Sequence, residues 1–546
     1  MFSRGWYRGY LQAETRGSEI SKSAGSALAA GKISAAVFLS RILGLVRDQV
    51  FARLFGASLF MDAWLVAFRV PGMLRDLFAE GALSSAFVPT FTEALQKGGR
   101  QAAFQLANLV LSSLMVGLGG FSIILFFFPD VFVTLLAAGF HEVPGKVEVT
   151  ATLIRILAPF LMLIALASTA MGMLNALNHF FLPALAPAIF NILVILAGLF
   201  LAPRFEEANL FPIYAMGAGA LAGGLMQWAV QIPMLRREGF RCRFRIDWHD
   251  PGIRRIARLI GPAIVGVSAV QINVLVNTQL ASFLQENGPV SWLSYAFRII
   301  YLPIGLFGVA VGVVNLKEVS VHVSRQSWEE VRETVANSLK LISFLAIPST
   351  AGLIVLAVPT VRTLFERGDF TPDDTLFTAH ALMLYALGLY AYSCIKVYVP
   401  TFYALGDTRT PVRISLLSVL VNLVANVTLI LILPGGYKYL GLALGTALSV
   451  TVNSSLMSYQ FRKRMGALEK YQVARMQWKA AAASLVMGGV VWATLIGIES
   501  TLPGGSLPEQ LIRLFLCIGV GIAVYTGMCL LLRVSEVRLL LFWNRS

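Results

Sequence analysis

Apolar stretches long enough to cross a membrane follow one another along almost the whole chain. A helix needs about 20 apolar residues to cross a hydrocarbon core of about 30 Å. The hydropathy pattern places fourteen such stretches at residues 31–54, 62–80, 103–128, 149–174, 183–202, 211–235, 256–284, 291–315, 336–360, 376–404, 411–433, 438–461, 477–498 and 509–532. The pattern therefore predicts an all-α polytopic membrane protein of about fourteen transmembrane helices.

The composition agrees with this prediction and excludes several classes of protein. Of the 546 residues 57% are hydrophobic and only 13% are charged, about half the charged share of a soluble domain. Four cysteines and five histidines are scattered without metal-type or redox spacing: Cys242, Cys394, Cys517, Cys529, His141, His179, His249, His322 and His380. We therefore expect neither an enzyme nor a bound cofactor.

Basic residues in the loops predict which way the chain crosses the membrane. The loops before residues 256 and 477 are rich in arginine and lysine, whereas alternate loops such as 55–61 and 285–290 have none. Cytoplasmic loops retain such residues, so both termini are expected to be cytoplasmic, including a basic tail at residues 1–26. The net charge of +15 mainly records this topology and attraction to membrane lipids, and gives no support to nucleic-acid binding.

Short motifs recur at one spacing and predict an internal repeat. Ala67-Phe68-Arg69 returns as Ala296-Phe297-Arg298, an offset of 229 residues, and Thr134-Leu135 returns as Thr363-Leu364 at the same offset. Six helices per repeat make the two halves parallel, related by a pseudo-two-fold axis along the membrane normal. The expected parts are an N-lobe at 27–240, a C-lobe at 241–465, and two extra helices with the cytoplasmic C-terminus at 466–546. Such two-lobed folds are typical of transporters.

Arginines inside the first two predicted helices are the strongest functional signal. A charge at mid-membrane costs about 2.5 to 3.5 kcal/mol, so four would cost roughly 10 kcal/mol or more unless they faced water or counter-charge. The repeat places Arg298 at the matching level of the eighth helix. Because arginine binds phosphate oxygens bidentately, we expect a wet, cationic cavity for an oxyanion such as a diphosphate, with candidate residues Arg41, Arg47, Arg69, Arg75 and Arg298.

Two further expectations concern the same helices. Pro71 and Gly72 are expected to break the second helix between Arg69 and Arg75. The alternative to a cavity is that the arginines reach the membrane surface or pair with nearby carboxylates, which nearly match them in number: Asp48, Asp62, Asp76 and Glu80.

Several blocks of sequence resemble the MurJ/MviN lipid II flippases of bacteria, within the multidrug/oligosaccharidyl-lipid/polysaccharide exporter superfamily. The blocks are SRILGLVRDQVFARLFGAS (40–58), DAWLVAF (62–68), LRDLFAEGALSSAFVP (74–89), SWLSYAFR (291–298) and FYALGDTRTPV (402–412). The resemblance implies alternating access that moves the undecaprenyl-diphosphate-linked peptidoglycan precursor, lipid II, from the inner to the outer leaflet of the cytoplasmic membrane. It implies lipid II, membrane lipids and proteins of cell-wall synthesis as partners.

The resemblance also implies roles for particular residues. Substrate-binding positions match at Arg41, Arg47, Asp62, Arg75 and Arg298, and Arg69 takes the place of another cavity cation. Ala52 and Ser291 stand at family positions that we expect to act in gating, together with the hinge residues Pro71 and Gly72.

The chain departs from the family pattern at a few positions. Phe297 and Tyr301 replace the acidic residues that commonly flank the arginine of the eighth helix, and Lys317 and Glu318 stand in a stretch that is usually apolar. Some members bind sodium through carboxylates in the seventh and eleventh helices, where this chain has amides, so sodium coupling is left open and membrane potential is an alternative energy source. The remaining alternatives are a flippase for another lipid-linked oligosaccharide and a membrane scaffold that does not transport.

Overall fold

A computed structural model describes residue 31 and residues 34–75, 82–284, 287–499 and 505–537. Every regular element in these ranges is a helix. The basic tail at 1–26 lies outside the described residues, as do Asp76 and Glu80.

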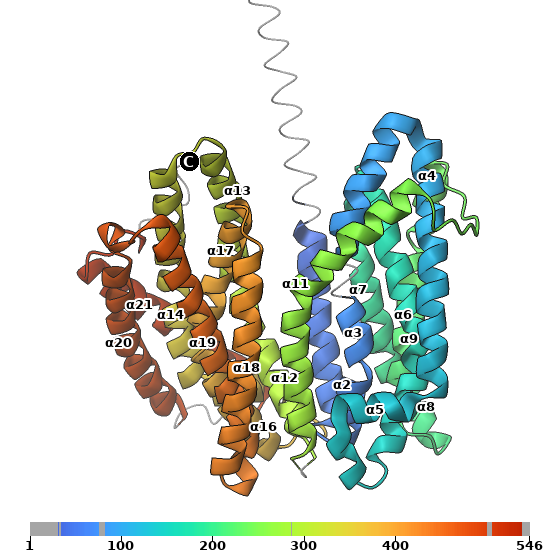
Figure 1. The fold of residues 1–546 in the computed structure, drawn as a ribbon. Coiled ribbons are helices and arrows are strands. Elements are labelled where there is room, and N and C mark those ends of the chain that lie inside the picture. Colours follow the sequence, from blue (N-terminus) through green and yellow to red (C-terminus); the bar gives the residue numbers. More distant parts are fainter. Residues whose placement is uncertain (1–30, 32–33, 76–81, 285–286, 500–504, 538–546) are drawn as a thin grey trace, which may run out of the picture. The chain divides into compact units, whose positions relative to one another are not determined.

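The first half of the chain forms a series of helices that begins with residues 34–55 (Figure 1). It continues with α2 (Leu59–Ala67), α3 (Arg69–Arg75), α4 (Ala82–Phe127), α5 (Pro129–Ala137), η2 (Ala138–Glu142), α6 (Lys146–Ala176), α7 (Phe181–Leu196), η3 (Ala197–Leu201), α8 (Ala202–Glu207), α9 (Ile213–Ala229) and α10 (Ile232–Arg237).

The second half forms a similar series, and two more helices follow it. It consists of α11 (Pro251–Ser282), α12 (Pro289–Pro303), η4 (Ile304–Val309), α13 (Ala310–Ser324), α14 (Trp328–Val355), α15 (Ala357–Phe365), α16 (Pro372–Ala386), α17 (Leu389–Ala404), α18 (Arg409–Ile432), η5 (Gly435–Tyr437), α19 (Lys438–Met465), η6 (Glu469–Tyr471), α20 (Val473–Glu499) and α21 (Leu507–Leu531).

The helices confirm the predicted membrane fold. Within the described residues ten helices are long and apolar enough to span a membrane, and α16 with α17 forms an eleventh span bent by 46°. These eleven coincide with eleven of the fourteen predicted segments. The other three predicted segments fall on residues 34–55, on α2 with α3, and on α11.

Helix boundaries confirm the internal repeat more clearly than the sequence motifs do. α5 and α15 have the same length and lie 228 residues apart, and the same offset joins the start of α7 to that of α18 and the end of α10 to that of α19. Even the turns repeat. Asn178 and Gly406 both have positive φ, 64° and 73°, after α6 and α17.

The two halves reverse direction at the same place but with different helix boundaries. α4 bends back on itself at Gly99, whose φ is 71° (Figure 1). At the corresponding place in the second half α13 ends, Gln326 has a φ of 57°, and Ser327 is the N-cap residue of α14. Both halves therefore reverse direction here through one residue in a left-handed conformation.

Packing divides the chain into two compact units that do not follow the halves. The first unit comprises Met1–Phe51, Ala67–Pro129 and Ala151–Ile264, and the second comprises Ala52–Val66, Asp130–Thr150 and Val265–Ser546. The second unit thus includes two short segments from the first half of the chain. The predicted lobe boundaries at 240 and 465 stay a prediction.

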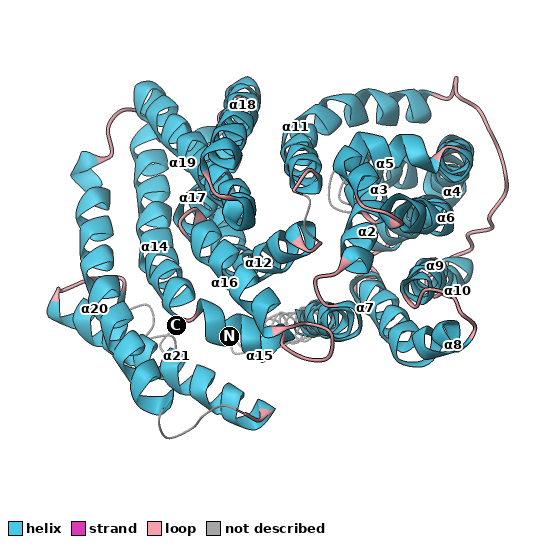
Figure 2. Cartoon of the chain, turned by 90° about the horizontal axis from the view of Figure 1, so that it is seen from below, coloured by secondary structure: helices cyan, strands magenta, loops and turns pink. Residues whose placement is uncertain are grey.

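Each unit has its own apolar core. In the first, the rings of Phe87, Phe91, Phe104 and Phe240 pack in sequence, with centroids 5.4 to 6.3 Å apart. In the second, α20 and α21 pack with α14, and Tyr525 donates a hydrogen bond of 2.9 Å to the Phe344 carbonyl (Figures 1 and 2). The two extra C-terminal helices are therefore integral to the second unit.

Candidate functional site

The second helix breaks earlier than the sequence predicts. α2 ends at Ala67 and α3 begins at Arg69, so the break lies at Phe68, and α3 continues through Pro71 and Gly72. The expected break between Arg69 and Arg75 is wrong. The reason is that Pro71 cannot donate a hydrogen bond four residues back, to the carbonyl of Ala67, which weakens the helix in the turn before the proline.

The candidate arginines differ in their surroundings. Arg41, on the first helix, Arg75, at the end of α3, and Arg298, on α12, are exposed, whereas Arg47 and Arg69 are half-buried. Arg41, Arg47, Arg69 and Arg75 belong to the first unit and Arg298 belongs to the second. A guanidinium that protrudes from a spanning helix must meet water, a counter-ion or a ligand, because acyl chains cannot solvate it.

Arg47 is held in place by two neighbours. Its Nη2 lies 2.8 Å from Asp48 Oδ1, and its Nη1 donates to Asn191 Oδ1 on α7 at 3.1 Å. The Asn191 amide in turn donates to the Ser40 carbonyl at 3.2 Å. Pairing with Asp48 is therefore real for Arg47, and the amide of Asn191 fixes the direction of the guanidinium.

Asp62 lies in a different setting from the arginines. Its carboxylate is fully buried and accepts hydrogen bonds from the Gly288 N–H at 2.9 Å, the Ser291 N–H at 2.9 Å and the Ser291 hydroxyl at 2.6 Å. Lys146 Nζ lies 2.9 Å from the same carboxylate and 4.3 Å from the centre of the Phe140 ring. These contacts join the start of α2 to the starts of α6 and α12, all within the second unit.

The carboxylate of Asp62 acts as a helix cap supplied from another part of the chain. Gly288, the N-cap residue of α12, has a φ of 111° and no side chain to bind the free N–H groups of the first turn. Asp62 binds the N–H of Ser291, the third residue of the helix, where a capping side chain normally acts. A carboxylate also suits the positive end of the helix dipole. Asp62 thus joins α2 to the start of α12.

Two backbone crossings beside Asp62 obey the internal repeat. The Gly139 N–H donates to Ser282 Oγ at 3.1 Å, and the Asp369 N–H donates to the Arg53 carbonyl at 3.0 Å. A Cβ on Gly139 would lie 2.2 Å from the Ser282 carbonyl oxygen, and one on Gly368 would lie 2.2 Å from that of Arg53. Gly368 stands 229 residues after Gly139, and Ser282 stands 229 residues after Arg53. Each half therefore lays the segment after its short helix against the end of the other half's first helix.

These contacts form one fastened end, which we define as the Asp62–Lys146–Ser291 cluster with the two glycine crossings. The expected gating residues Ala52 and Ser291 lie in it and are fully buried. The same contacts explain why residues 52–66 and 130–150 belong to the second unit.

Lys146 and Asn191 are the residues that the sequence did not single out. Lys146 was visible as the one basic residue in the otherwise bare loop 129–148, and Asn191 as a lone amide in an apolar helix. Each is a single polar residue among residues of another kind, and a polar group that becomes buried needs a partner.

A largely buried amide cluster joins α11, α18 and α19, where the sequence left sodium binding open. Asn426 Nδ2 donates to Asn277 Oδ1 at 2.7 Å and to Asn422 Oδ1 at 3.0 Å, and the Asn277 amide donates to Thr446 Oγ1 at 3.0 Å. Sodium, a hard cation, prefers a shell of oxygen ligands, which carboxylates, amides and hydroxyls can all supply. Oxygens of Asn277, Asn422 and Thr446 meet here, and Asn426 Oδ1 lies against Gly445, buried and without a hydrogen-bond partner among the described residues. No carboxylate is present in the cluster, and we assign no sodium site to it.

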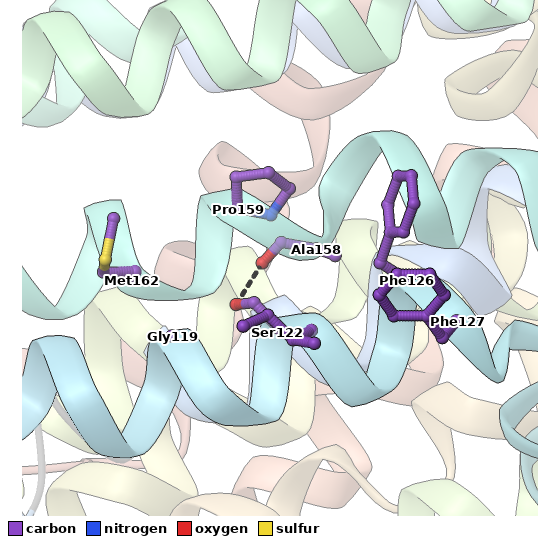
Figure 3. Close-up of a pocket in the computed structure, with 8 residues that line it drawn as sticks. Gly119, Ser122, Phe126, Phe127, Ala158, Pro159 and Met162 are labelled. Atoms are coloured by element: carbon purple, nitrogen blue, oxygen red, sulfur yellow. Dashed lines mark hydrogen bonds between the residues drawn. The ribbon is translucent and has the colours of Figure 1, made fainter.

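Two cavities in the described residues have other linings. An apolar one of about 260 Å³ lies between α4 and α6, beside the 2.6 Å hydrogen bond from Ser122 Oγ to the Ala158 carbonyl (Figure 3). A polar cleft of about 760 Å³ is lined by both arms of α4 and by residues 245–255. Neither is lined by the candidate arginines. No group of three His, Cys, Asp or Glu side chains in the described part of the chain could hold a metal ion.

The family departures place aromatic rings beside Arg298. The Phe297 ring packs against Tyr301, Tyr385 and Tyr392 at centroid distances of 5.5 to 6.1 Å. Tyr301 is 50% exposed and follows Arg298 by about one turn, whereas Lys317 and Glu318 are exposed on α13. A carboxylate at position 297 or 301 would repel an anion bound to Arg298, whereas Phe297 and Tyr301 carry no charge.

Comparison with known proteins agrees with this fold. A sequence profile described as lipid II flippase MurJ matches residues 51–512. The chain is 35% identical to a probable lipid II flippase MurJ of Vibrio cholerae, over 92% of this chain and 95% of that protein. It is 32% identical to the lipid II flippase MurJ of Burkholderia cenocepacia, over 91% and 95%.

Solved structures point the same way. A lipid II flippase MurJ in an inward closed conformation matches with a TM-score of 0.75 and 29% identity, over 92% of this chain and 98% of that one. An inward-facing multidrug resistance MATE transporter of the MOP superfamily matches with a TM-score of 0.67 at 15% identity, over 79% and 96%, which indicates a shared fold alone. The chain therefore belongs to the MurJ family of lipid II flippases.

Proposed function

We propose that this chain is a transporter that moves lipid II from the inner to the outer leaflet of the bacterial cytoplasmic membrane by alternating access. The observation that carries the proposal is the family match along residues 51–512, combined with arginines at 47, 75 and 298 in segments that the sequence predicts to lie in the membrane. No covalent step is needed, because the lipid and its head group leave chemically unchanged.

We propose that the fastened end faces the outside of the cell. The segments that form it, 55–61, 129–148 and 287–290, contain a single lysine or arginine, Lys146, whereas the loop between α10 and α11 is rich in arginine. Basic loops stay on the cytoplasmic side. Both termini are then cytoplasmic.

Arginines are suited to hold the diphosphate of lipid II. A guanidinium stays charged and binds two phosphate oxygens in parallel. Arg41, Arg75 and Arg298 carry exposed guanidinium groups, and Arg47 is oriented by Asn191. Arg69 adds a fifth cation at the break between α2 and α3.

Asp62 has a different role in this proposal: it closes the outer end. Export requires that end to open, so the bonds from Asp62 to Lys146 and Ser291 must break in each cycle and re-form afterwards. Incoming water offsets the loss, because both charges are then solvated. The ion pair therefore contributes to the balance between the two states without preventing the change.

Membrane potential can supply the energy for export. Moving two negative charges outward across a cell-negative membrane releases up to roughly 5 kcal/mol per 100 mV if both cross the full field. No step is assigned to sodium, because no carboxylate is present in the amide cluster to balance its charge.

The proposal is tested in two stages. The chain is first expressed in a bacterium depleted of its own lipid II flippase, where growth and normal cell shape support the function. Purified protein in proteoliposomes must then expose fluorescent lipid II to an external reagent. Transport of a different lipid-linked oligosaccharide but not of lipid II would reassign the substrate. If neither were transported, the alternative of a membrane scaffold that does not transport would be favoured.

A further inference from the structure

An extended segment between α10 and α11 has a composition that the proposed function does not explain. Residues 241–248, which we call the linker strap, read RCRFRIDW and have no helical or strand structure (Figure 2). All eight residues are exposed. Backbone groups outside helices and strands need other partners, so the contacts that bind this backbone show how the segment is held.

Two side chains of α4 fasten the strap by its backbone. The Asn108 amide donates to the Arg241 carbonyl at 3.0 Å and accepts from the Arg243 N–H at 2.9 Å, and Ser112 Oγ accepts from the Arg245 N–H at 2.9 Å. One helical turn rises about 5.4 Å, close to the roughly 6.6 Å of two extended residues. The strap therefore runs along α4, with alternate residues turned to the helix.

The fastening leaves two chemically different sets of side chains free. The arginines alternate with apolar residues, and Phe244 and Trp248 are 65% and 61% exposed. Side chains of an extended segment alternate between its two faces. The guanidinium groups of Arg241, Arg243 and Arg245 have no ion-pair partner in the part of the chain that the structure describes.

The depth of the strap follows from the length of α4. A hydrocarbon core of about 30 Å takes up about 20 helical residues, and α4 ends at Phe127. Counting back places the other edge of the core near Asn108, where the strap is attached. Aromatic residues are enriched and arginines bind lipid phosphates at this level of a membrane. The polar cleft of about 760 Å³ adjoins the strap at Arg245 and Ile246.

We propose that the linker strap is a binding surface for anionic phospholipid head groups of the leaflet that it faces. The three arginines bind the phosphates, while Phe244, Ile246 and Trp248 enter the boundary between head groups and acyl chains. The surface is separate from the arginines assigned to lipid II and does not depend on that assignment. It ties the segment that joins the two halves of the chain to the membrane surface.

Cys242 allows a direct test in the full chain. It is exposed, whereas Cys394, Cys517 and Cys529 are buried, so a nitroxide label attaches to the strap without engineering. Power-saturation EPR in nanodiscs compares its accessibility to oxygen and to a water-soluble nickel complex. In bilayers containing phosphatidylglycerol we expect accessibility to nickel several-fold below that in pure phosphatidylcholine. A label at Gln326→Cys in a Cys242→Ser background serves as the aqueous control.

Two variants complete the test. Replacing Arg241, Arg243 and Arg245 together by glutamine should abolish the effect of phosphatidylglycerol, and Arg→Lys at the same positions should retain most of it, because the charge remains. A Cys242 label as accessible to nickel as the control in both bilayers would overturn the proposal. So would a shielded label that ignores lipid charge, since a protein contact would then cover the strap.

Discussion

The fastened end and the arginine-bearing helices differ in how far their charged side chains are buried. At the fastened end Asp62 has no exposed surface, and Lys146, Gly288 and Ser291 all bind it. Along the spanning helices Arg41, Arg75 and Arg298 remain exposed. The difference indicates two uses: Asp62 holds elements of the second unit together, whereas an exposed arginine can also bind a ligand.

Removing candidate arginines should have the largest effect on transport. Arg47→Ala, Arg75→Ala and Arg298→Ala each remove a charged hydrogen-bonding group worth about 1.5 to 3 kcal/mol, which is roughly a 10- to 100-fold loss of lipid II affinity. We expect each to fail in complementation at normal membrane levels. Arg413→Ala on α18, exposed but outside the candidate set, is the control. A triple variant that still transports would contradict the diphosphate assignment.

Breaking the fastened end should come next and should act on stability. Asp62→Ala leaves Lys146 buried without a counter-charge, a change that costs about 3 to 5 kcal/mol for a buried pair. Thermal unfolding in detergent measures the loss. Adding Lys146→Met to Asp62→Ala should recover part of it, because the uncompensated charge is gone. Strictly additive effects of the two substitutions would show that the ion pair does not couple these elements.

The two glycine crossings offer a test of symmetry. A methyl group at Gly139 or Gly368 would lie 2.2 Å from a carbonyl oxygen, so either alanine variant should force the crossing apart and cost about 1 to 3 kcal/mol. Gly368→Ala should cost more, since its φ of 61° is strained for alanine. Gly117→Ala, which meets open space, is the control. If neither variant differs from that control in unfolding temperature, the crossings are not tight contacts.

The amide cluster predicts the smallest effect. Because Asn277, Asn422 and Asn426 bind one another and present no carboxylate, replacing external and internal sodium by choline should leave the rate of lipid II transport unchanged. Reconstituted vesicles with a fixed membrane potential provide the measurement. A severalfold decrease without sodium would show that a sodium site exists elsewhere or that the cluster rearranges to bind it.

The sequence predicted the fold well because the membrane imposes it. Spanning length and the 229-residue repeat follow from hydropathy and spacing, and the helix boundaries agree. The position of the break in the second helix was wrong by several residues, since Pro71 acts on the carbonyl of Ala67 in the turn before it.

The partners of charged residues were harder to predict. Asp62 was expected to bind substrate. Nothing in the sequence indicates that Asp62 caps the helix that begins after Gly288, 226 residues away. The Asp62–Lys146 contact joins residues 84 positions apart. Such pairings depend on how helices cross, which hydropathy and spacing do not determine.

A reversible cross-link at the fastened end tests most directly whether that end must open for transport. Arg53→Cys and Asp369→Cys replace residues joined by a backbone hydrogen bond of 3.0 Å, in a background where the exposed Cys242 is serine. We predict that oxidation stops lipid II transport in proteoliposomes, that reduction restores it, and that neither single cysteine responds. Full transport by the cross-linked protein would contradict the account.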